Sequence, residues 1–139
     1  ESVNLFLLEQ GKDIKAVVLL RSLVVKNRVT RQIAQFFETY DIFISPVLAA
    51  PPLKIGILST DMDDIEEMMG NLLSYMPFTG MFNLTGQPAM SVPLHWTPDG
   101  LPVGVQFAAK YANESLLYRL AGQLEKAKPW IDKRPPLYV

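Results

Sequence analysis

The chain has 139 residues, the length of one domain or of part of a larger one, and its 13 basic and 14 acidic residues leave a net charge of −1. This balance argues against nucleic-acid binding, and the absence of cysteine excludes disulfides, thiolate nucleophiles and cysteine-bound zinc. Apolar runs are too short for a membrane span, and residues 1–10 do not resemble a signal peptide. We therefore expect a cytoplasmic protein.

A long helix is predicted at residues 13–40. Apolar residues recur there at steps of three and four and form one stripe, which comprises Ile14, Val17, Val18, Val24, Val25, Val29, Ile33, Phe36, Phe37 and Tyr40. The β-branched residues around Val24 lower the intrinsic helix propensity. Packing against other elements must therefore stabilise this helix.

A buried strand is predicted at residues 42–45, because three consecutive apolar residues precede Pro46. Further prolines at positions 51 and 52 indicate an extended loop. Residues 61–76 are acidic and rich in methionine, and they fit a helix or a loop. Asp61, Asp63 and Asp64 lie at the start of this segment, where a helix dipole favours negative charge.

The next elements are separated by glycine and proline. A short helix is predicted to end at Gly86, with Pro88 as the stop signal. Strands are predicted at 89–94 and 103–108, with a turn at residues 98–100 between them.

A final helix is predicted to begin after Asn113 as the N-cap and to end before Pro129, and residues 131–139 are expected to form a loosely held tail. Three apolar strands with helices between them predict an α/β fold. If the last two strands form a hairpin, the sheet would be mixed.

No catalytic constellation can be derived from residue patterns alone. His95, the only histidine, lies at a strand end without a neighbouring acidic pattern, so a surface role is favoured. Lys12 is expected to be solvated. The acidic group at residues 61–67 lacks the glycine and ligand spacing of a calcium loop. We therefore expect neither a metal nor a cofactor.

Three hydroxyl side chains, those of Thr79, Thr85 and Ser91, lie in the glycine- and proline-rich stretch. No base that would activate any of them is evident. Capping of helices or satisfaction of backbone groups is the favoured role for all three.

Two consecutive segments carry a family resemblance. The segment "PFTGMFNLTGQPAMSVPLHWTPDGLPVGVQF" at 77–107, followed by "NESLLYRLAGQLEKAKPW" at 113–130, closely resembles the carboxy-terminal end of amidase signature enzymes. The matching residues are Pro77, Phe78, Thr79, Asn83, Thr85, Gly86, Pro88, Asp99, Gly100, Leu101, Pro102, Gly104, Gln106, Pro129 and Trp130. Tyr40, Asp41 and Pro46 match an earlier strand and loop of the family, so the resemblance covers about residues 14–130.

The resemblance implies a large mixed sheet covered by helices and a cofactor-free hydrolase of amide bonds. Family members use a Ser-cisSer-Lys triad, and all three residues lie upstream of the matched region. This chain has no Gly-Gly-Ser-Ser-like segment, and Lys12 stands too close to the late helix, so no catalytic residue is carried over. Within the family, the segment "GQPAMSVPLHWTPDGLPVGVQF" resembles bacterial amidases akin to 6-aminohexanoate cyclic-dimer hydrolase.

We therefore expect residues 1–139 to be a carboxy-terminal fragment of a larger amidase domain, inactive by itself, whose complete form binds an amide substrate. Phe78, Thr79 and Asn83 are the candidate substrate-binding residues, because a loop before a short helix can approach the substrate. The alternative is that Thr79 and Asn83 only fix the turn.

A second hypothesis is a free-standing, non-catalytic binding or scaffold module that has kept the amidase fold. Either way, the chain has few charges, 19% of its residues, and a mean hydropathy of +0.14, which suggests apolar surface that meets a partner. A fragment cut from a larger sheet also exposes strand edges and faces, so we expect self-association.

Overall fold

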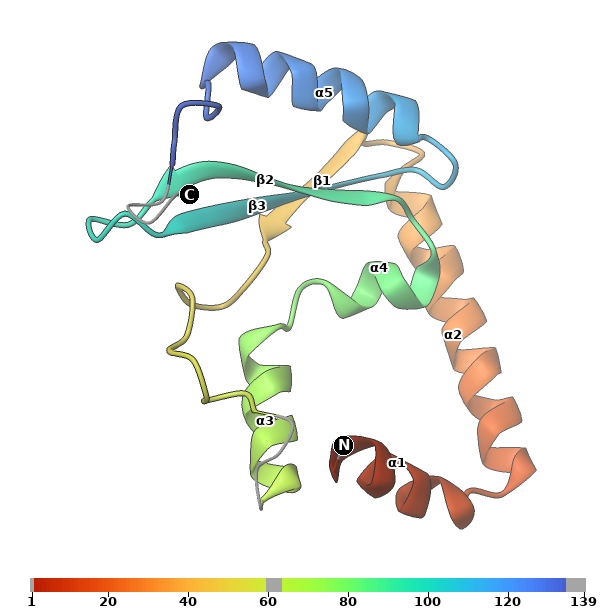
Figure 1. The fold of residues 1–139 in the computed structure, drawn as a ribbon. Helices are drawn as coiled ribbons and strands as arrows, with labels where there is room; N and C mark the ends of the chain where they lie inside the picture. Colours follow the sequence, from red (N-terminus) through yellow and green to blue (C-terminus); the bar gives the residue numbers. More distant parts are fainter. Residues whose placement is uncertain (1, 60–63, 135–139) are drawn as a thin grey trace.

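The computed structural model describes residues 2–59 and 64–134 and contains a three-stranded sheet, which lies in the upper half of Figure 1. The strands are β1 (Ile42–Pro46), β2 (Ala89–Trp96) and β3 (Pro102–Ala109), in the order β1-β3-β2. All three predicted strands are confirmed, with ends that differ by at most two residues. Both pairings are antiparallel, so the described part of the expected mixed sheet contains no parallel pair.

Strands β2 and β3 form a hairpin, and its tip is the turn predicted from the sequence. The Gly100 N–H donates to the Thr97 carbonyl at 2.9 Å. Gly100 has a φ of +83°, a value that residues other than glycine rarely adopt. The Thr97 hydroxyl also accepts from the Leu101 N–H at 3.0 Å. This turn brings β2 back against β3, so that Ser91 lies opposite Gln106.

One face of the sheet is covered by α5 (Glu114–Ala127) (Figure 1). Its residue Leu117 packs with Val92 and Phe107 in the main apolar cluster. Alternation along the strands places these side chains on the same face. Asn113 occupies the predicted N-cap position, although its side chain makes no capping hydrogen bond, and the helix ends before Pro129 as expected.

The other face is covered by α4 (Gly80–Thr85) and by the carboxy-terminal end of α2 (Ala16–Phe36). Phe82 of α4 packs on Ala108 of β3 and on the ring of Phe43, with 5.6 Å between the two phenyl centroids. The short helix predicted before Gly86 is therefore confirmed, and Gly86 has the left-handed φ of +84° expected at a helix end.

The prediction of a long helix at 13–40 is wrong about both of its ends. It begins at Ala16, because the chain turns at residues 11–15 and Lys15 is extended. The helix ends at Phe36. Tyr40 lies beyond the helix, in the turn that follows, and its ring stacks on the Phe36 ring with 4.7 Å between the centroids. A separate helix, α1 (Ser2–Lys12), precedes it and was not predicted.

The acidic segment contains α3 (Ile65–Tyr75). Asp64 is its N-cap and accepts from the Glu67 N–H at 2.9 Å, so the predicted acidic helix start is confirmed there. Asp61 and Asp63 lie outside the described residues.

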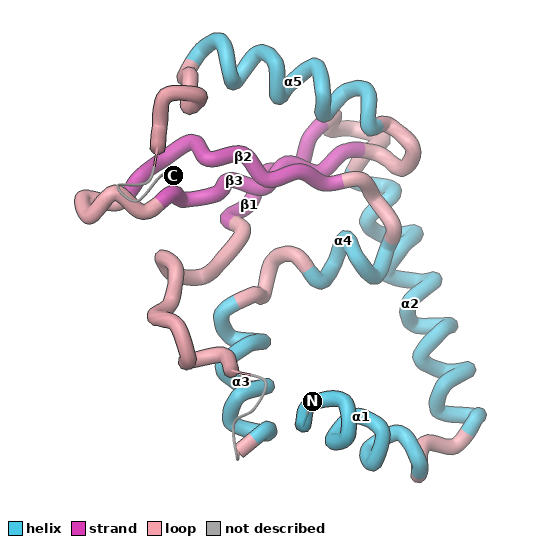
Figure 2. The backbone as a smooth tube through the Cα atoms, in the orientation of Figure 1, coloured by secondary structure: helices cyan, strands magenta, loops and turns pink. Residues whose placement is uncertain are grey.

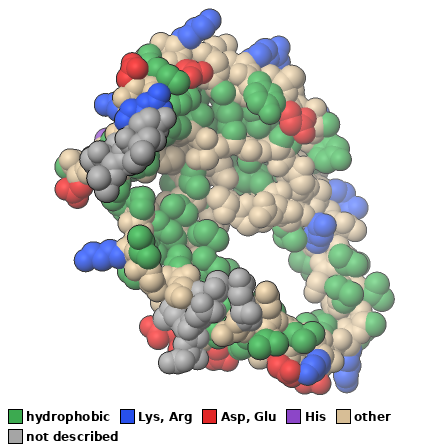
Figure 3. All heavy atoms as spheres, in the orientation of Figure 1, with side chains coloured by type: hydrophobic (Ala, Val, Ile, Leu, Met, Phe, Trp, Pro, Cys, Tyr) green, Lys and Arg blue, Asp and Glu red, His purple; other side chains and the backbone are tan. Residues whose placement is uncertain are grey.

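Helices α1, α2 and α3 surround an opening below the sheet instead of packing tightly together (Figures 2 and 3). No residue of α1 or α2 is buried. The amino-terminal half of α2 exposes apolar side chains all round its circumference, namely Val17, Val18, Leu19, Leu20, Leu23, Val24 and Val25. A helix that is apolar all round is normally buried, so this one lacks its cover in the chain as described.

None of the helices in the described part of the chain has the length and apolar character needed to cross a membrane.

An exposed ion pair joins the segment after α2 to the segment after β3. Lys110 donates to Glu38 at 2.7 Å, and this hydrogen bond, followed by the lysine charge, lowers the pKa of the Glu38 carboxyl. Because this pKa is lower in the folded chain, the pair stabilises the fold at pH values above the ordinary pKa of a carboxyl group. This stabilisation is lost as the pH falls through the lowered pKa of Glu38. The contribution is small because both side chains are exposed.

We expect Lys110→Met to raise the pKa of Glu38 toward that of a free glutamate, because the donor and the positive charge are both removed. A carboxyl-detected NMR titration measures this. The matched control Lys126→Met removes the same charge from α5 and should leave the Glu38 pKa unchanged. An equal shift in both variants would mean that net charge, not the pair, sets the pKa.

Candidate functional site

The sheet face under α4 changes from apolar to polar along the strands. Near Phe82 it presents Phe43 and Ala108, whereas further along, the same face presents Ser45, Ser91 and Gln106. An open hollow of ≈ 290 Å³ lies over this polar part, and its lining consists of Val47, Thr79, Phe82, Asn83, Gln87, Ala89, Met90, Ser91 and Gln106.

Thr79 and Asn83 both line this hollow. They are four residues apart at the start and middle of α4, which places them on one face of the helix. The Thr79 side chain makes no capping hydrogen bond, so it does not fix the start of the helix through its hydroxyl. The substrate-binding role of Thr79 and Asn83 stays a prediction.

Phe78 is placed differently from the other two predicted residues. Its side chain is half-buried and does not line the hollow. Its backbone carbonyl instead accepts a hydrogen bond from Gln106 Nε2 at 3.4 Å. Phe78 therefore belongs to the framework of the site.

Thr85 has the structural role that the sequence favoured for all three hydroxyls. Its buried hydroxyl donates to the Met81 carbonyl at 2.8 Å and also contacts the side chain of Gln87, which is buried as well. The Pro88 carbonyl accepts from the Ala109 N–H at 3.0 Å. The Thr-Gly-x-Pro part of the motif thus ends α4 and starts β2.

The residue patterns missed Gln106 as part of the site. It is only 5% exposed, and its amide nitrogen donates to Ser45 Oγ at 2.9 Å as well as to the Phe78 carbonyl. Two signals were present: Gln106 matches the family motif, and it lies between the apolar residues Val105 and Phe107 of a predicted strand. A buried glutamine requires partners, but the sequence does not name them.

Gly104 is required by the close packing beside the hollow. A Cβ added there would lie 2.6 Å from Ser91 Oγ and 3.0 Å from Val47 Cγ2, distances at which side chains must shift. The small residue therefore lets the loop after β1 lie directly on the sheet.

The polar side chains that line the hollow are neutral: two hydroxyls, from Thr79 and Ser91, and three carboxamides, from Asn83, Gln87 and Gln106. Such groups can both donate to and accept from a neutral amide. The Ser45 hydroxyl, next to them, donates to the Pro46 carbonyl at 3.0 Å and is paired with Gln106, neither of which is a base. This arrangement suits binding, not nucleophilic attack.

Two further residues considered for chemistry lie elsewhere. Lys12 is exposed on α1 and pairs with Glu9 at 2.5 Å, as expected for a solvated lysine. His95 is exposed on β2. Over residues 2–59 and 64–134, no cluster of three or more side chains is suited to holding a metal ion.

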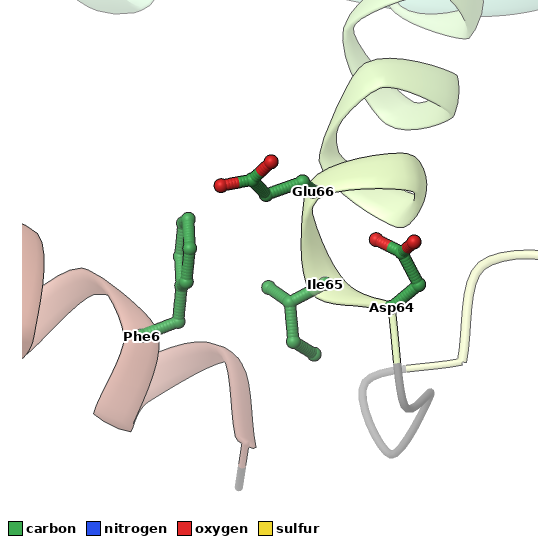
Figure 4. Close-up of a pocket in the computed structure, with 4 residues that line it drawn as sticks. All are labelled: Phe6, Asp64, Ile65 and Glu66. Atoms are coloured by element: carbon green, nitrogen blue, oxygen red, sulfur yellow. The ribbon is translucent and has the colours of Figure 1, made fainter.

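A second hollow, of ≈ 420 Å³, lies between α1 and α3, and Figure 4 shows the residues that line it, Phe6, Asp64, Ile65 and Glu66. The Asp64 carboxylate is already used as the cap of α3. Phe6 and Ile65 face each other across the gap (Figure 4), so the surface offered is mainly apolar. This hollow provides no converging set of polar groups.

Comparison with known proteins identifies the family. The model of the Amidase family matches residues 1–118. The chain belongs to the amidase family. AmiC of Mycobacterium leprae is 40% identical over 116 residues, which cover 84% of this chain and 23% of AmiC. The 6-aminohexanoate-cyclic-dimer hydrolase of Paenarthrobacter ureafaciens is 39% identical over 103 residues, which cover 70% of this chain and 21% of the hydrolase.

The fold agrees with that of a solved amidase. The structure of a 6-aminohexanoate cyclic dimer hydrolase matches 99% of this chain with a TM-score of 0.87 and 30% sequence identity. The match confirms the predicted amidase fold and the similarity to this subgroup. The chain spans only 30% of that solved chain, and less than a quarter of the two relatives above.

Proposed function

We propose that this chain is the carboxy-terminal part of an amidase that hydrolyses carboxylic amide bonds. The observation that carries the proposal is the match of nearly the whole chain to 30% of a cyclic-dimer hydrolase. In the complete protein, a Ser-cisSer-Lys triad would lie upstream of these residues, as the family resemblance implies. The described serines near the hollow have no lysine or histidine partner, which is consistent with a triad located elsewhere.

Within that enzyme, the hollow under α4 would form part of the substrate pocket. Thr79 and Asn83 would contact the substrate, and the framework that includes Phe78 would hold them in place. The neutral polar lining supports a neutral substrate, a linear, cyclic or aryl amide, because a charged one would lack a counter-charge there. A relative named acylamidase, from Rhodococcus erythropolis, is 34% identical over 100 residues.

The remaining part of the same domain would cover α1 and the amino-terminal half of α2. We propose that these apolar surfaces drive self-association when the chain is produced without that cover. The cytoplasmic location expected from the sequence stays a prediction.

Amide turnover tests the proposal. We expect the complete protein to hydrolyse 4-nitroacetanilide or the cyclic dimer of 6-aminohexanoate, while the 139-residue chain releases no product above the uncatalysed rate, because it lacks the nucleophile. Product release is followed by absorbance for the anilide and by chromatography for the cyclic dimer.

Two outcomes would contradict the proposal. Turnover by the chain alone that disappears when one of its own serines is changed would show that the catalytic residues lie within it. A complete protein that binds amides without cleaving any of them would favour the non-catalytic module.

A further inference from the structure

Gln106 connects three separate segments through a single side chain. One hydrogen of its amide nitrogen bonds Ser45 Oγ in β1 at 2.9 Å, and the other bonds the Phe78 carbonyl before α4 at 3.4 Å. The side chain itself comes from β3, the central strand. Only 5% of Gln106 is exposed, so water does not compete freely for these bonds.

The direction of the hydrogen bonds explains why a carboxamide is needed. The Ser45 hydroxyl gives its only proton to the Pro46 carbonyl, so Ser45 Oγ must accept from Gln106. The Phe78 carbonyl is also an acceptor. The position therefore requires a neutral side chain with two donors on one atom, which glutamate and methionine do not supply.

The bond to Phe78 bears on the side chains in the hollow. Phe78 directly precedes Thr79, whose carbonyl accepts the Phe82 N–H of the first turn of α4 at 3.2 Å. Fixing the Phe78 carbonyl therefore fixes the peptide plane at which α4 starts. The orientation of that first turn in turn decides where Thr79 and Asn83 enter the hollow.

We propose that Gln106 is a positioning residue, which holds the start of α4 against the sheet so that Thr79 and Asn83 face the substrate. This role rests on the proposed amidase function, and Gln106 acts through α4 without contributing to the chemical step.

The first test needs no enzymatic activity. In the 139-residue chain, Gln106→Met keeps the size of the side chain but removes both donors. We expect the Phe82 amide to exchange its hydrogen with solvent about tenfold faster, while the amides of α5 keep their rates, because the loss is local. Hydrogen exchange measured by NMR gives both values.

The matched control is Ser45→Ala. It removes one acceptor of Gln106 but leaves the bond to Phe78, so the Phe82 amide should change less than threefold. If Gln106→Met does not fold, Gln106→Asn, which keeps the neutral amide but shortens its reach to the Phe78 carbonyl, takes its place. Equal acceleration in α4 and α5, or no acceleration in either, overturns the proposal.

The second test separates positioning from general stability in the complete enzyme. Gln106→Met should raise KM for an anilide about tenfold with a smaller change in kcat, since the triad lies elsewhere and substrate contacts are displaced. A lower kcat at unchanged KM would indicate only a reduced amount of folded enzyme and would contradict positioning. Absence of turnover in the unmodified complete protein would refute the amidase function itself, whereas the exchange result would still report on Gln106.

Discussion

Glutamate in place of both Leu20 and Val24 should prevent the self-association that we propose for this chain and leave a monomer. These side chains are 62% and 67% exposed on the part of α2 that is apolar all round. Burial of a leucine or valine contributes about 1.5–3 kcal/mol, and a charge placed in the same interface removes that gain. The dissociation constant should therefore rise at least about a hundredfold.

Sedimentation velocity over a range of concentrations measures this change, and circular dichroism checks that the helices persist. The matched control is Gln32→Glu with Gln35→Glu, which adds the same two negative charges to exposed polar positions of the same helix. This control should still associate. If the unmodified chain is a monomer at high concentration, the uncovered face of α2 does not drive association.

Two threonines six residues apart should respond in opposite ways to the same substitution. In the complete enzyme, Thr79→Val should lower kcat/KM about tenfold, because the hydroxyl that we propose to contact the substrate is lost from the lining of the hollow. It should change the free energy of unfolding by less than about 0.5 kcal/mol, because this hydroxyl makes no capping bond.

Thr85→Val should do the reverse. It removes the donor to the Met81 carbonyl and the partner of the buried Gln87, which should cost about 1–3 kcal/mol of stability. The kcat/KM of the enzyme that remains folded should be close to normal. Steady-state kinetics with active-site titration and denaturant unfolding give both quantities, and a kinetic defect confined to Thr85→Val would reverse the two assignments.

The same role is proposed for Asn83 as for Thr79, since it lines the same hollow from the same side of α4. Both were proposed from the sequence because a loop before a short helix can approach the substrate. Phe78 was proposed with them, and the structure shows why three neighbours in a motif need not share a role. Its carbonyl accepts from Gln106, and Phe78 is not among the residues that line the hollow.

Local patterns were sufficient for most of the fold. Short apolar segments predicted the three strands, and glycines with positive φ ended α4 and formed the hairpin turn where expected. The long helix was less accurate. The apolar pattern continues past the last residue of the helix, because Tyr40 packs on Phe36 although it lies in the loop that follows α2. Periodicity alone cannot distinguish these two cases.

The sequence by itself determined the family, the strand positions and the candidate side chains Thr79 and Asn83, because these depend on residues that are close together in the chain. Only the tertiary structure decided which hydroxyl is structural, that Gln106 joins β1 to the start of α4, and that half of α2 is uncovered. The physical reason is separation along the chain, since Gln106 lies 61 residues from Ser45 and 28 from Phe78. A buried amide shows that partners are needed, but the packing of the sheet against α4 determines which ones it has.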